Sequence, residues 1–323
     1  MTIKLLYIRF PNFHEGGVQR YSSNFLHLLS KYKSEKYEII DLAKLYEPLV
    51  NDNSSSTNDH AHIISKITLA VDFSEIKIAI ADVGLLEYRE FYFIQELKRQ
   101  YPNIITIATI HDSPKFIVNY NPIFQSAQSN NFIRAARKLY NFLYSSSYDR
   151  DFLKCIDFFQ VLTITGKQLL LKKMDELIAN RFSTNFINVS NHPLMDDFTS
   201  TETYLDTSRN NIRLGYLGFI TYSKGIDILI SAIAKIKNVK PDLLDGFVLN
   251  IAGRASTKHD KNYLDKLIKF TFDNNLSNNV FFLGYLEDSK IKDFIIDLDL
   301  LVLPYRAVDT GSASGPLMWA QSY

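Results

Sequence analysis

The sequence predicts an α/β fold with two Rossmann-like, doubly wound parallel-sheet domains, and three features of its 323 residues support this prediction. Short apolar runs rich in Ile and Val alternate with segments of helical periodicity, as in parallel sheets that helices cover on both faces. A polar stretch at residues 197–211 interrupts the alternation. The alternation then restarts, and the chain is long enough for two hydrophobic cores.

The first domain, residues 1–196, is expected to contain six parallel strands. Each is nearly continuous in hydrophobicity, which is typical of strands that are buried on both faces. The segment 18–32 follows the first strand and repeats apolar residues at helical spacing, for example at Tyr21 and Phe25. The six strands are predicted at residues 3–9, 37–41, 76–82, 104–112, 158–165 and 186–190.

The second domain, residues 212–323, follows the linker 197–211 and repeats the same alternation. Its strands are predicted at residues 212–218, 247–253, 279–284 and 300–304, and its helices at 224–237, 260–273 and 288–296. Two such domains in one chain favour a ligand site in a cleft between them.

The composition excludes several classes of protein. With 36 basic and 35 acidic residues the net charge is +1, which provides no global attraction to nucleic acid, so any anion site must be local. A single cysteine, Cys155, excludes an intrachain disulfide and favours a buried small side chain. Because no apolar run reaches the ~18 residues of a membrane span and the first residues do not resemble a signal peptide, we expect a cytoplasmic protein.

Lys224 is the first candidate for anion binding. It lies at the predicted start of the helix 224–237, where Ser223 is expected to cap the helix and Gly225 follows. A positive charge at this end of a helix is unfavourable unless an anion lies nearby, so the position indicates a bound phosphate. The alternative is a solvated lysine whose charge faces water.

A second helix start lies near the end of the sequence. Pro316 suits the first turn of a helix, and the small residues Ser314 and Gly315 leave backbone N–H groups accessible before it. Arg254 and Arg306 each follow a predicted parallel strand, and ligands gather at those carboxyl ends. These residues together predict a site for a phosphate-rich ligand in the second domain.

The first domain offers weaker signals. Gly16 and Gly17 permit close approach of a ligand to the turn after the first strand, but the dinucleotide fingerprint needs three glycines, and a tight turn without a ligand is the alternative. Asp41 ends the next strand, where an acid that binds ribose would lie. His111 ends the strand 104–112 and is expected to face the cleft, where it can hydrogen-bond a hydroxyl or stabilise charge; a structural histidine is the alternative.

Two further patterns favour ordinary structural interpretations. Asp297 and Asp299 resemble a metal-binding pair, yet they directly precede a strand and simply end the preceding helix. Residues 130–144 combine basic and aromatic side chains, which is compatible with docking at a membrane surface but more typical of a core stripe beside a solvated face.

These residues together resemble the family-4 (group 1) nucleotide-sugar glycosyltransferases, which have the GT-B fold. No single motif is specific, but all occur in the order that the family has and cover the chain from end to end. They are GGVQR (16–20), HD (111–112), LGFITYSKG (217–225), LNIAGR (249–254), NVFFLGYL (279–286), DLLVLPYR (299–306) and SGPLMWAQSY (314–323).

The resemblance implies a glycosyltransferase of the hexosyltransferase type, with a role in polysaccharide biosynthesis. It would transfer a sugar, with retention at the anomeric carbon, from a nucleotide diphosphate sugar to a glycan or lipid-linked acceptor, and contact with a membrane would bring it to lipid-linked acceptors. Lys224, Ser314 and Gly315 would hold the diphosphate in the second domain. Gly16 and Gly17 would approach the donor, and His111 would line the sugar site. Neither a cofactor nor a metal is required, because cationic and helix-end groups neutralise the leaving diphosphate.

The sequence also departs from the family pattern. The family has two glutamates around the last helix start, and Gly311 and Trp319 occupy those positions here. The strands and helices that complete the second domain in the family are missing, so we expect that domain to be incomplete. Two alternatives follow: a catalytically inactive nucleotide-sugar-binding or scaffold protein of the same fold, and a dinucleotide-dependent oxidoreductase suggested by Gly16, Gly17 and Asp41.

Overall fold

The chain divides into two compact units. The first contains Met1–Pro193 and the second contains Leu194–Asp309 and Ser314–Tyr323. The computed structural model describes residues 2–9, 17–33, 35–45, 67–68, 71–83, 89–111, 153–178, 186–190, 212–306 and 314–323. The expected linker 197–211, the basic and aromatic segment 130–144, Gly16 and Gly311 lie outside these residues.

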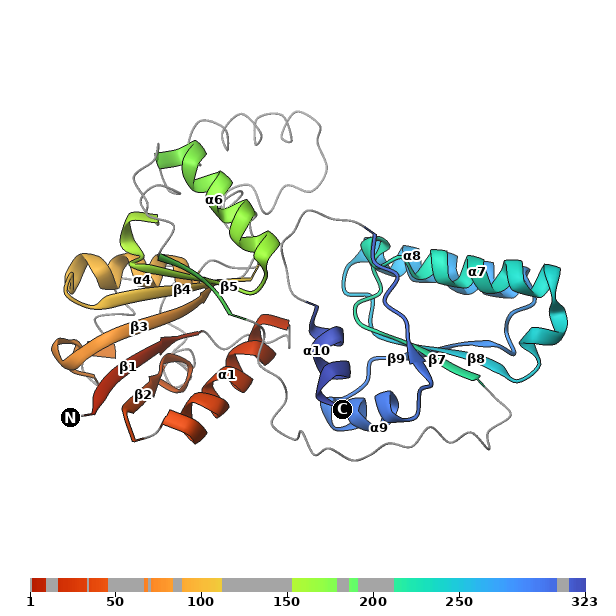
Figure 1. The fold of residues 1–323 in the computed structure, drawn as a ribbon, viewed down its shortest axis with the longest axis horizontal. Coiled ribbons are helices and arrows are strands. Elements are labelled where there is room, and N and C mark those ends of the chain that lie inside the picture. The colour runs from red at the N-terminus through yellow and green to blue at the C-terminus, as the bar shows by residue number, and fades with distance from the viewer. Residues whose placement is uncertain are drawn as a thin grey trace. The chain divides into compact units, whose positions relative to one another are not determined.

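The first unit is a six-stranded parallel sheet in the order β2-β1-β3-β4-β5-β6 (Figure 1). Helix α1 packs on one face through Leu26 and Phe25, and helices α4 and α6 pack on the other face. The strands are β1 (Ile3–Ile8), β2 (Tyr37–Asp41), β3 (Ile76–Val83), β4 (Ile105–Ile110), β5 (Phe158–Val161) and β6 (Ile187–Val189). The helices are α1 (Gly17–Lys33), α4 (Arg89–Gln100) and α6 (Ile164–Ile178).

The second unit is a four-stranded parallel sheet in the order β10-β7-β8-β9. Helices α7 and α8 cover one face, and α9 and α10 lie on the other (Figure 1). The strands are β7 (Ile212–Leu217), β8 (Phe247–Ala252), β9 (Val280–Gly284) and β10 (Leu300–Leu301). The helices are α7 (Ile226–Val239), α8 (Lys258–Asp273), α9 (Asp288–Ile296) and α10 (Gly315–Ser322). The predicted fold class, α/β with two doubly wound parallel sheets, is confirmed.

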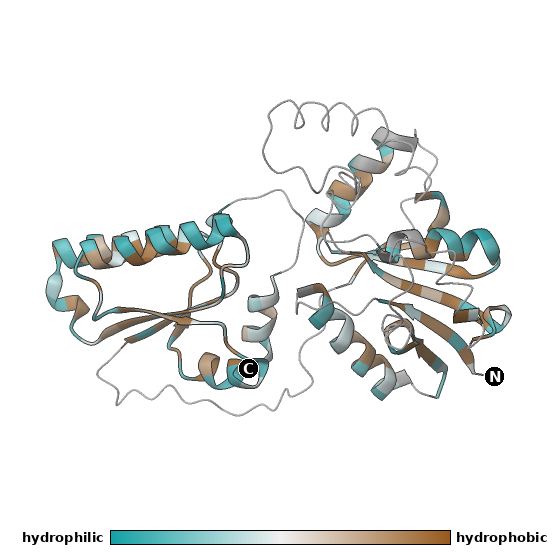
Figure 2. Cartoon of the chain, turned by 180° about the vertical axis from the view of Figure 1, so that it is seen from behind, coloured by the Kyte–Doolittle hydropathy of each residue, from teal (hydrophilic) through white to brown (hydrophobic). Residues whose placement is uncertain are grey.

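Hydrophobic side chains are concentrated in the sheets. The strands are mainly hydrophobic along their length, whereas the helices alternate hydrophilic and hydrophobic turns (Figure 2). In the second unit, Leu249 and Ile251 of β8 are fully buried against Ile230 of α7. This pattern is the reason why near-continuous apolar runs could be recognised as parallel strands.

Two predicted strands were clearly too long. The run 300–304 forms a strand only at β10 (Leu300–Leu301), and the run 158–165 is cut short by a helix. The apolar run 158–165 was expected to be a single strand, but β5 ends at Val161 and α6 begins at Ile164. The hydroxyl of Thr163 accepts a hydrogen bond from the N–H of Gly166 at 2.9 Å, which is a capping interaction at the start of a helix. Hydrophobicity alone does not separate a buried strand from the first turn of the helix that follows it.

Each sheet contains a topological switch point, where successive connections leave in opposite directions. In the second unit the chain runs from β7 through β8 to β9 and then crosses to β10, on the other side of β7. In the first unit it runs from β1 to β2 and then crosses to β3, on the other side of β1. Ligands of open parallel sheets bind outside the carboxyl ends of the strands at such points. A ligand site is therefore expected beside the residues that follow β7, β10, β1 and β3.

Candidate functional site

Lys224 lies in a short 3-10 helix that follows β7. This helix, η5 (Tyr222–Lys224), is followed by Gly225, which has φ +69° and is the N-cap residue of α7. The prediction that Ser223 caps the helix is wrong. Its hydroxyl lies 3.0 Å from that of Thr221, and α7 has no side-chain cap. The helix begins at Ile226 rather than at residue 224, and Lys224 lies just before its N-cap residue, near the positive end of α7.

Gly225 is required at its position for two reasons. Its φ of +69° is strained for residues with a side chain. In addition, a Cβ atom there would lie 1.9 Å from the carbonyl oxygen of Pro304, which follows β10. The N–H of Arg306 donates a 2.9 Å hydrogen bond to the carbonyl of Ser223. The loop after β10 therefore lies directly against the loop after β7, at the switch point.

Tyr305 connects the two helix starts that the sequence singled out. The Nζ atom of Lys224 lies 3.9 Å from the centroid of the Tyr305 ring, within the range of a cation–π contact. The hydroxyl of Tyr305 lies 3.0 Å from that of Ser314, the N-cap residue of α10. Burial raises the pKa of Tyr305, so its hydroxyl is protonated at neutral pH. The structure thus brings Lys224 and Ser314 together around a residue that the sequence analysis did not identify.

Helix α10 begins much as predicted. The Ser314 hydroxyl accepts a 3.3 Å hydrogen bond from the N–H of Leu317, and Pro316 lies in the first turn. A Cβ atom on Gly218, the residue after β7, would lie 3.3 Å from Pro316, which places this helix start beside the end of β7. Trp319, at the position where the resemblance expects a glutamate, is buried in a cluster with Leu217.

Arg306 is engaged in an ion pair. Its Nη1 and Nη2 atoms donate to the two carboxylate oxygens of Asp227 at 2.9 and 2.6 Å, and its guanidinium lies 3.8 Å from the ring centroid of Tyr222. The hydroxyl of Tyr263 also donates to Asp227, at 2.6 Å. The hydrogen bonds from Arg306 hold the pKa of Asp227 below its ordinary value. Arg306 therefore fixes the loop after β10 to the first turn of α7, and its contact with a donor phosphate stays a prediction.

Arg254 follows β8 and lies among aromatic side chains. Its guanidinium carbon is 5.7 Å from the ring centroid of Phe219 and 5.3 Å from that of Tyr285, so residues after β7, β8 and β9 meet here. Its carbonyl accepts a 3.0 Å hydrogen bond from the N–H of Ile220. All these groups lie at the carboxyl ends of the strands, as the sequence predicted for Arg254.

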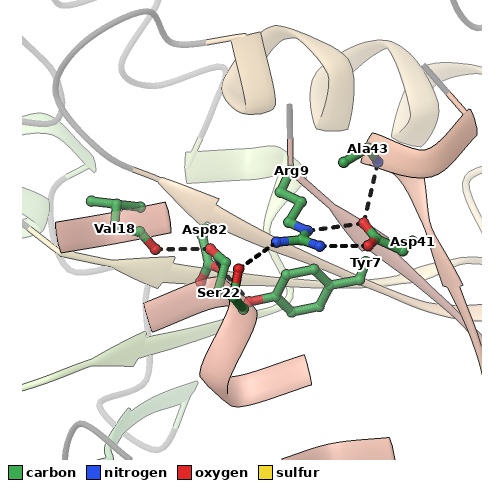
Figure 3. Close-up of polar contacts among 8 residues, drawn as sticks. Tyr7, Arg9, Val18, Ser22, Asp41, Ala43 and Asp82 are labelled. Atoms are coloured by element: carbon green, nitrogen blue, oxygen red, sulfur yellow. Dashed lines mark hydrogen bonds and ion pairs between the residues drawn. The ribbon is translucent and has the colours of Figure 1, made fainter. Parts of the chain in front are cut away.

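The first unit contains a buried polar cluster at its own switch point (Figure 3). Asp82, at the end of β3, is 2% exposed and accepts hydrogen bonds from the hydroxyls of Tyr7 and Ser22. Burial raises the pKa of Tyr7 well above its ordinary value, which keeps this phenol protonated. Both donors come from elements adjacent to β3 at the switch point, because Tyr7 is on β1 and Ser22 is on α1.

His111 belongs to the same cluster. It is 7% exposed, with Nε2 3.5 Å from a carboxylate oxygen of Asp82 and its ring in an edge-to-face contact with Tyr21, 4.6 Å between centroids. His111 therefore has contacts within the first unit, and its contact with a sugar stays a prediction. Gly17 is the first residue of α1, close to Ser22 in the chain.

Asp41 forms an ion pair with Arg9. The guanidinium donates to both carboxylate oxygens, at 3.0 and 2.6 Å, and to the hydroxyl of Ser23 at 2.9 Å (Figure 3). The carboxylate also accepts from the N–H of Ala43. The acid that was expected where a dinucleotide ribose would bind thus joins β1, β2 and α1.

Sequence reasoning missed Tyr305, Asp227 and Asp82. The only available signals were their positions, since Asp82 ends a predicted strand, Tyr305 directly follows one, and Asp227 lies in the first turn of a predicted helix. Asp297 and Asp299 are both engaged by Arg213, through its guanidinium and its N–H respectively. Within the described ranges, no cluster of three or more His, Cys, Asp or Glu residues is arranged to bind a metal ion. Among the helices described, none has the length and apolar character needed to cross a bilayer.

Part of the second unit matches a known protein family. Residues 205–313 match the family model described as "Glycosyl transferases group 1". No curated protein matches the sequence. Among solved structures, HepE of Anabaena in complex with UDP is 14% identical, with a TM-score of 0.59 over 95% of this chain and 75% of that one. A glycosyltransferase from Rickettsia africae is 15% identical, with a TM-score of 0.53 over 94% and 73% of the two chains.

A third structure extends the same likeness. It is described as trehalose-6-phosphate from E. coli bound with UDP-2-fluoro glucose, and it is 11% identical, with a TM-score of 0.59 over 93% of this chain and 78% of that one. At these identities the structures establish a shared fold, and the family model covers the unit that contains Lys224, Arg306 and Tyr305. Residues 205–313 of the second unit therefore match a group 1 glycosyltransferase domain, and the chain shares its fold with these solved structures.

Proposed function

We propose that this protein is a glycosyltransferase that transfers a sugar from a nucleoside diphosphate sugar, with retention at the anomeric carbon, to a glycan or lipid-linked acceptor. The observation that supports the donor class is the arrangement around Tyr305. Lys224, at the start of α7, and Ser314, at the start of α10, converge at the switch point of the second sheet. HepE, with the same fold, has been solved with UDP, with UDP and glucose, and with UDP-glucose.

The proposed donor site supplies the charge that the reaction needs. A pyrophosphate between the two helix starts would receive the Lys224 ammonium, the N–H groups of the first turn of α10 and the positive end of each helix dipole. As the bond from the sugar to the diphosphate breaks, negative charge accumulates on the leaving group, and fixed positive groups lower the barrier. A metal ion is then not required in this proposal, and removal of divalent cations with EDTA should leave the transfer rate unchanged.

Other residues would bind the nucleoside and the sugar of the donor. Arg254, between Phe219 and Tyr285, offers a planar cation and aromatic rings to the nucleoside. Gly16 and Gly17 would approach the donor from the first unit, and His111 would contact the transferred sugar. The acceptor would bind against the first unit.

Calorimetry with UDP and GDP tests the donor site. We expect the parent protein to bind at least one of them and Lys224→Ala to bind it about 10- to 100-fold more weakly, as for the loss of a charge-assisted hydrogen bond worth about 1.5 to 3 kcal/mol. Lys235→Ala is the matched control, because Lys235 is an exposed lysine on the same helix and should leave affinity unchanged. Absence of binding to both nucleotides would overturn the proposed donor class.

Transfer itself is tested by NMR of the product. With an α-linked donor and a panel of glycan and lipid-linked acceptors, the new bond should be α-linked, and a β-linked product would contradict retention. Donor binding without transfer to any acceptor would instead support the inactive nucleotide-sugar-binding alternative. That alternative is motivated by Trp319, which is buried where the family has a glutamate.

A further inference from the structure

We propose that Tyr305 is a positioning residue that holds the Lys224 ammonium in place before the donor binds and couples it to the start of α10. The inference rests on the proposed function, because it assigns to Lys224 a role toward the donor diphosphate. The contacts that carry it are the 3.9 Å separation between Lys224 Nζ and the Tyr305 ring and the 3.0 Å separation between the hydroxyls of Tyr305 and Ser314.

The face of the Tyr305 ring offsets the repulsion between the Lys224 ammonium and the positive end of α7. Lys224 directly precedes α7, where the helix dipole disfavours a positive charge when no anion is bound. The face of an aromatic ring carries negative electrostatic potential and attracts an ammonium group. The ring can therefore keep the ammonium near the switch point in the unliganded protein.

The position of Tyr305 is fixed by its own backbone. The N–H of Val302 donates to the carbonyl of Gly215 in β7 at 2.8 Å, and the N–H of Arg306 donates to Ser223 at 2.9 Å. Tyr305 lies between these two hydrogen bonds, and its half-buried ring packs against the core that α7 and the sheet form. The ring is therefore held by neighbours on both sides of the switch point.

A held lysine binds an anion more tightly than a mobile one. A lysine side chain loses conformational entropy when it is fixed, and a contact that fixes it beforehand removes part of that cost from binding. The hydroxyl of Tyr305 adds a link to the N-cap residue whose helix would present N–H groups to the same diphosphate. Tyr305 would thus connect Lys224 with the start of α10, the two parts of the proposed phosphate site, without touching the donor.

A double-mutant cycle on UDP or GDP affinity tests the inference. Tyr305→Phe keeps the ring and should stay within about threefold of the parent, whereas Tyr305→Leu should weaken binding about 3- to 10-fold, as expected from loss of a cation–π contact. In a Lys224→Met background, Tyr305→Leu should have little further effect, because the group that it positions is gone. An equal loss in both backgrounds, or no loss in either, would overturn the inference.

A second measurement does not depend on donor binding. The Hε protons of Lys224 should resonate upfield of their position in the Tyr305→Leu variant, because they lie over the ring, and Tyr305→Phe should retain that shift. If the parent protein binds neither UDP nor GDP, the proposed function fails, and this shift alone then decides whether Tyr305 holds Lys224. Absence of the shift in the parent would overturn the inference even if the donor binds.

Discussion

Asp227 accepts both Nη groups of Arg306 at 2.9 and 2.6 Å, and this pair joins the first turn of α7 to the loop after β10. The two residues are 79 positions apart in the chain, and the order of the sheet makes them neighbours because β10 lies beside β7. The pair therefore holds together the two loops between which Lys224 and Tyr305 meet.

Loss of this pair should destabilise the second unit modestly. We expect Asp227→Asn to lower the free energy of unfolding by up to about 1 kcal/mol, since both partners are partly exposed and such pairs are screened by water. Urea denaturation measures the change. Asp265→Asn, at an exposed position on α8, is the control and should have no measurable effect. An equal loss in both variants would contradict the assignment.

The same pair predicts a pH dependence of stability. The pKa of Asp227 is lowered in the folded state by its hydrogen bonds to Arg306, so the stabilisation is fully present above the unfolded pKa of about 3.9 and is lost as the pH falls through the folded value. Glu96, with a pKa lowered to about 2 by Arg99, titrates in the same acidic range. The quantity to compare is therefore the difference in urea stability between the parent and Asp227→Asn, which should shrink below about pH 4.

Gly225 and Gly284 provide a matched pair of glycines for the contact with Pro304. Both have positive φ, +69° and +74°, but a Cβ atom on Gly284 would meet nothing within 4 Å. Gly284→Ala should cost only the backbone strain of about 1 to 2 kcal/mol. Gly225→Ala should add about 1 to 3 kcal/mol, because the Pro304 carbonyl must move.

Nucleotide binding provides a second measurement, at the proposed donor site. Because Pro304 precedes Tyr305, Gly225→Ala should also weaken UDP or GDP binding. Thermal denaturation and calorimetry measure the two effects. Equal destabilisation by the two substitutions would contradict the close approach of Pro304 to Gly225.

Asp82 is the residue of the first unit whose removal should be most harmful. In Asp82→Ala the hydroxyl of Tyr7 would lose its acceptor in a site that excludes water, and such an unsatisfied group costs about 1 to 3 kcal/mol. The hydroxyl of Ser22 would keep the carbonyl of Val18, 3.0 Å away, as an acceptor. Urea denaturation should therefore show a loss of about 1 to 3 kcal/mol. Adding Tyr7→Phe to Asp82→Ala should recover part of the loss, because the stranded hydroxyl is then removed. Strictly additive losses would contradict the shared hydrogen bonds.

The sequence by itself determined the layout of this protein. Ile- and Val-rich runs located every strand that the structure describes, and Lys224, Arg254, Arg306 and His111 were correctly placed after or at the ends of strands. These features depend on local periodicity, which each segment carries within its own residues. The boundary between β5 and α6 was missed because a buried strand and a buried helical turn have the same composition.

Only the tertiary structure decided how the site residues are paired. Lys224 lies over Tyr305, Arg306 is bound to Asp227, and His111 is packed in the cluster around Asp82. Such partners are set by the order of strands in each sheet, which brings β10 beside β7 and β3 beside β1. That order results from packing free energy summed over a whole unit, so no single segment contains the information that would reveal it.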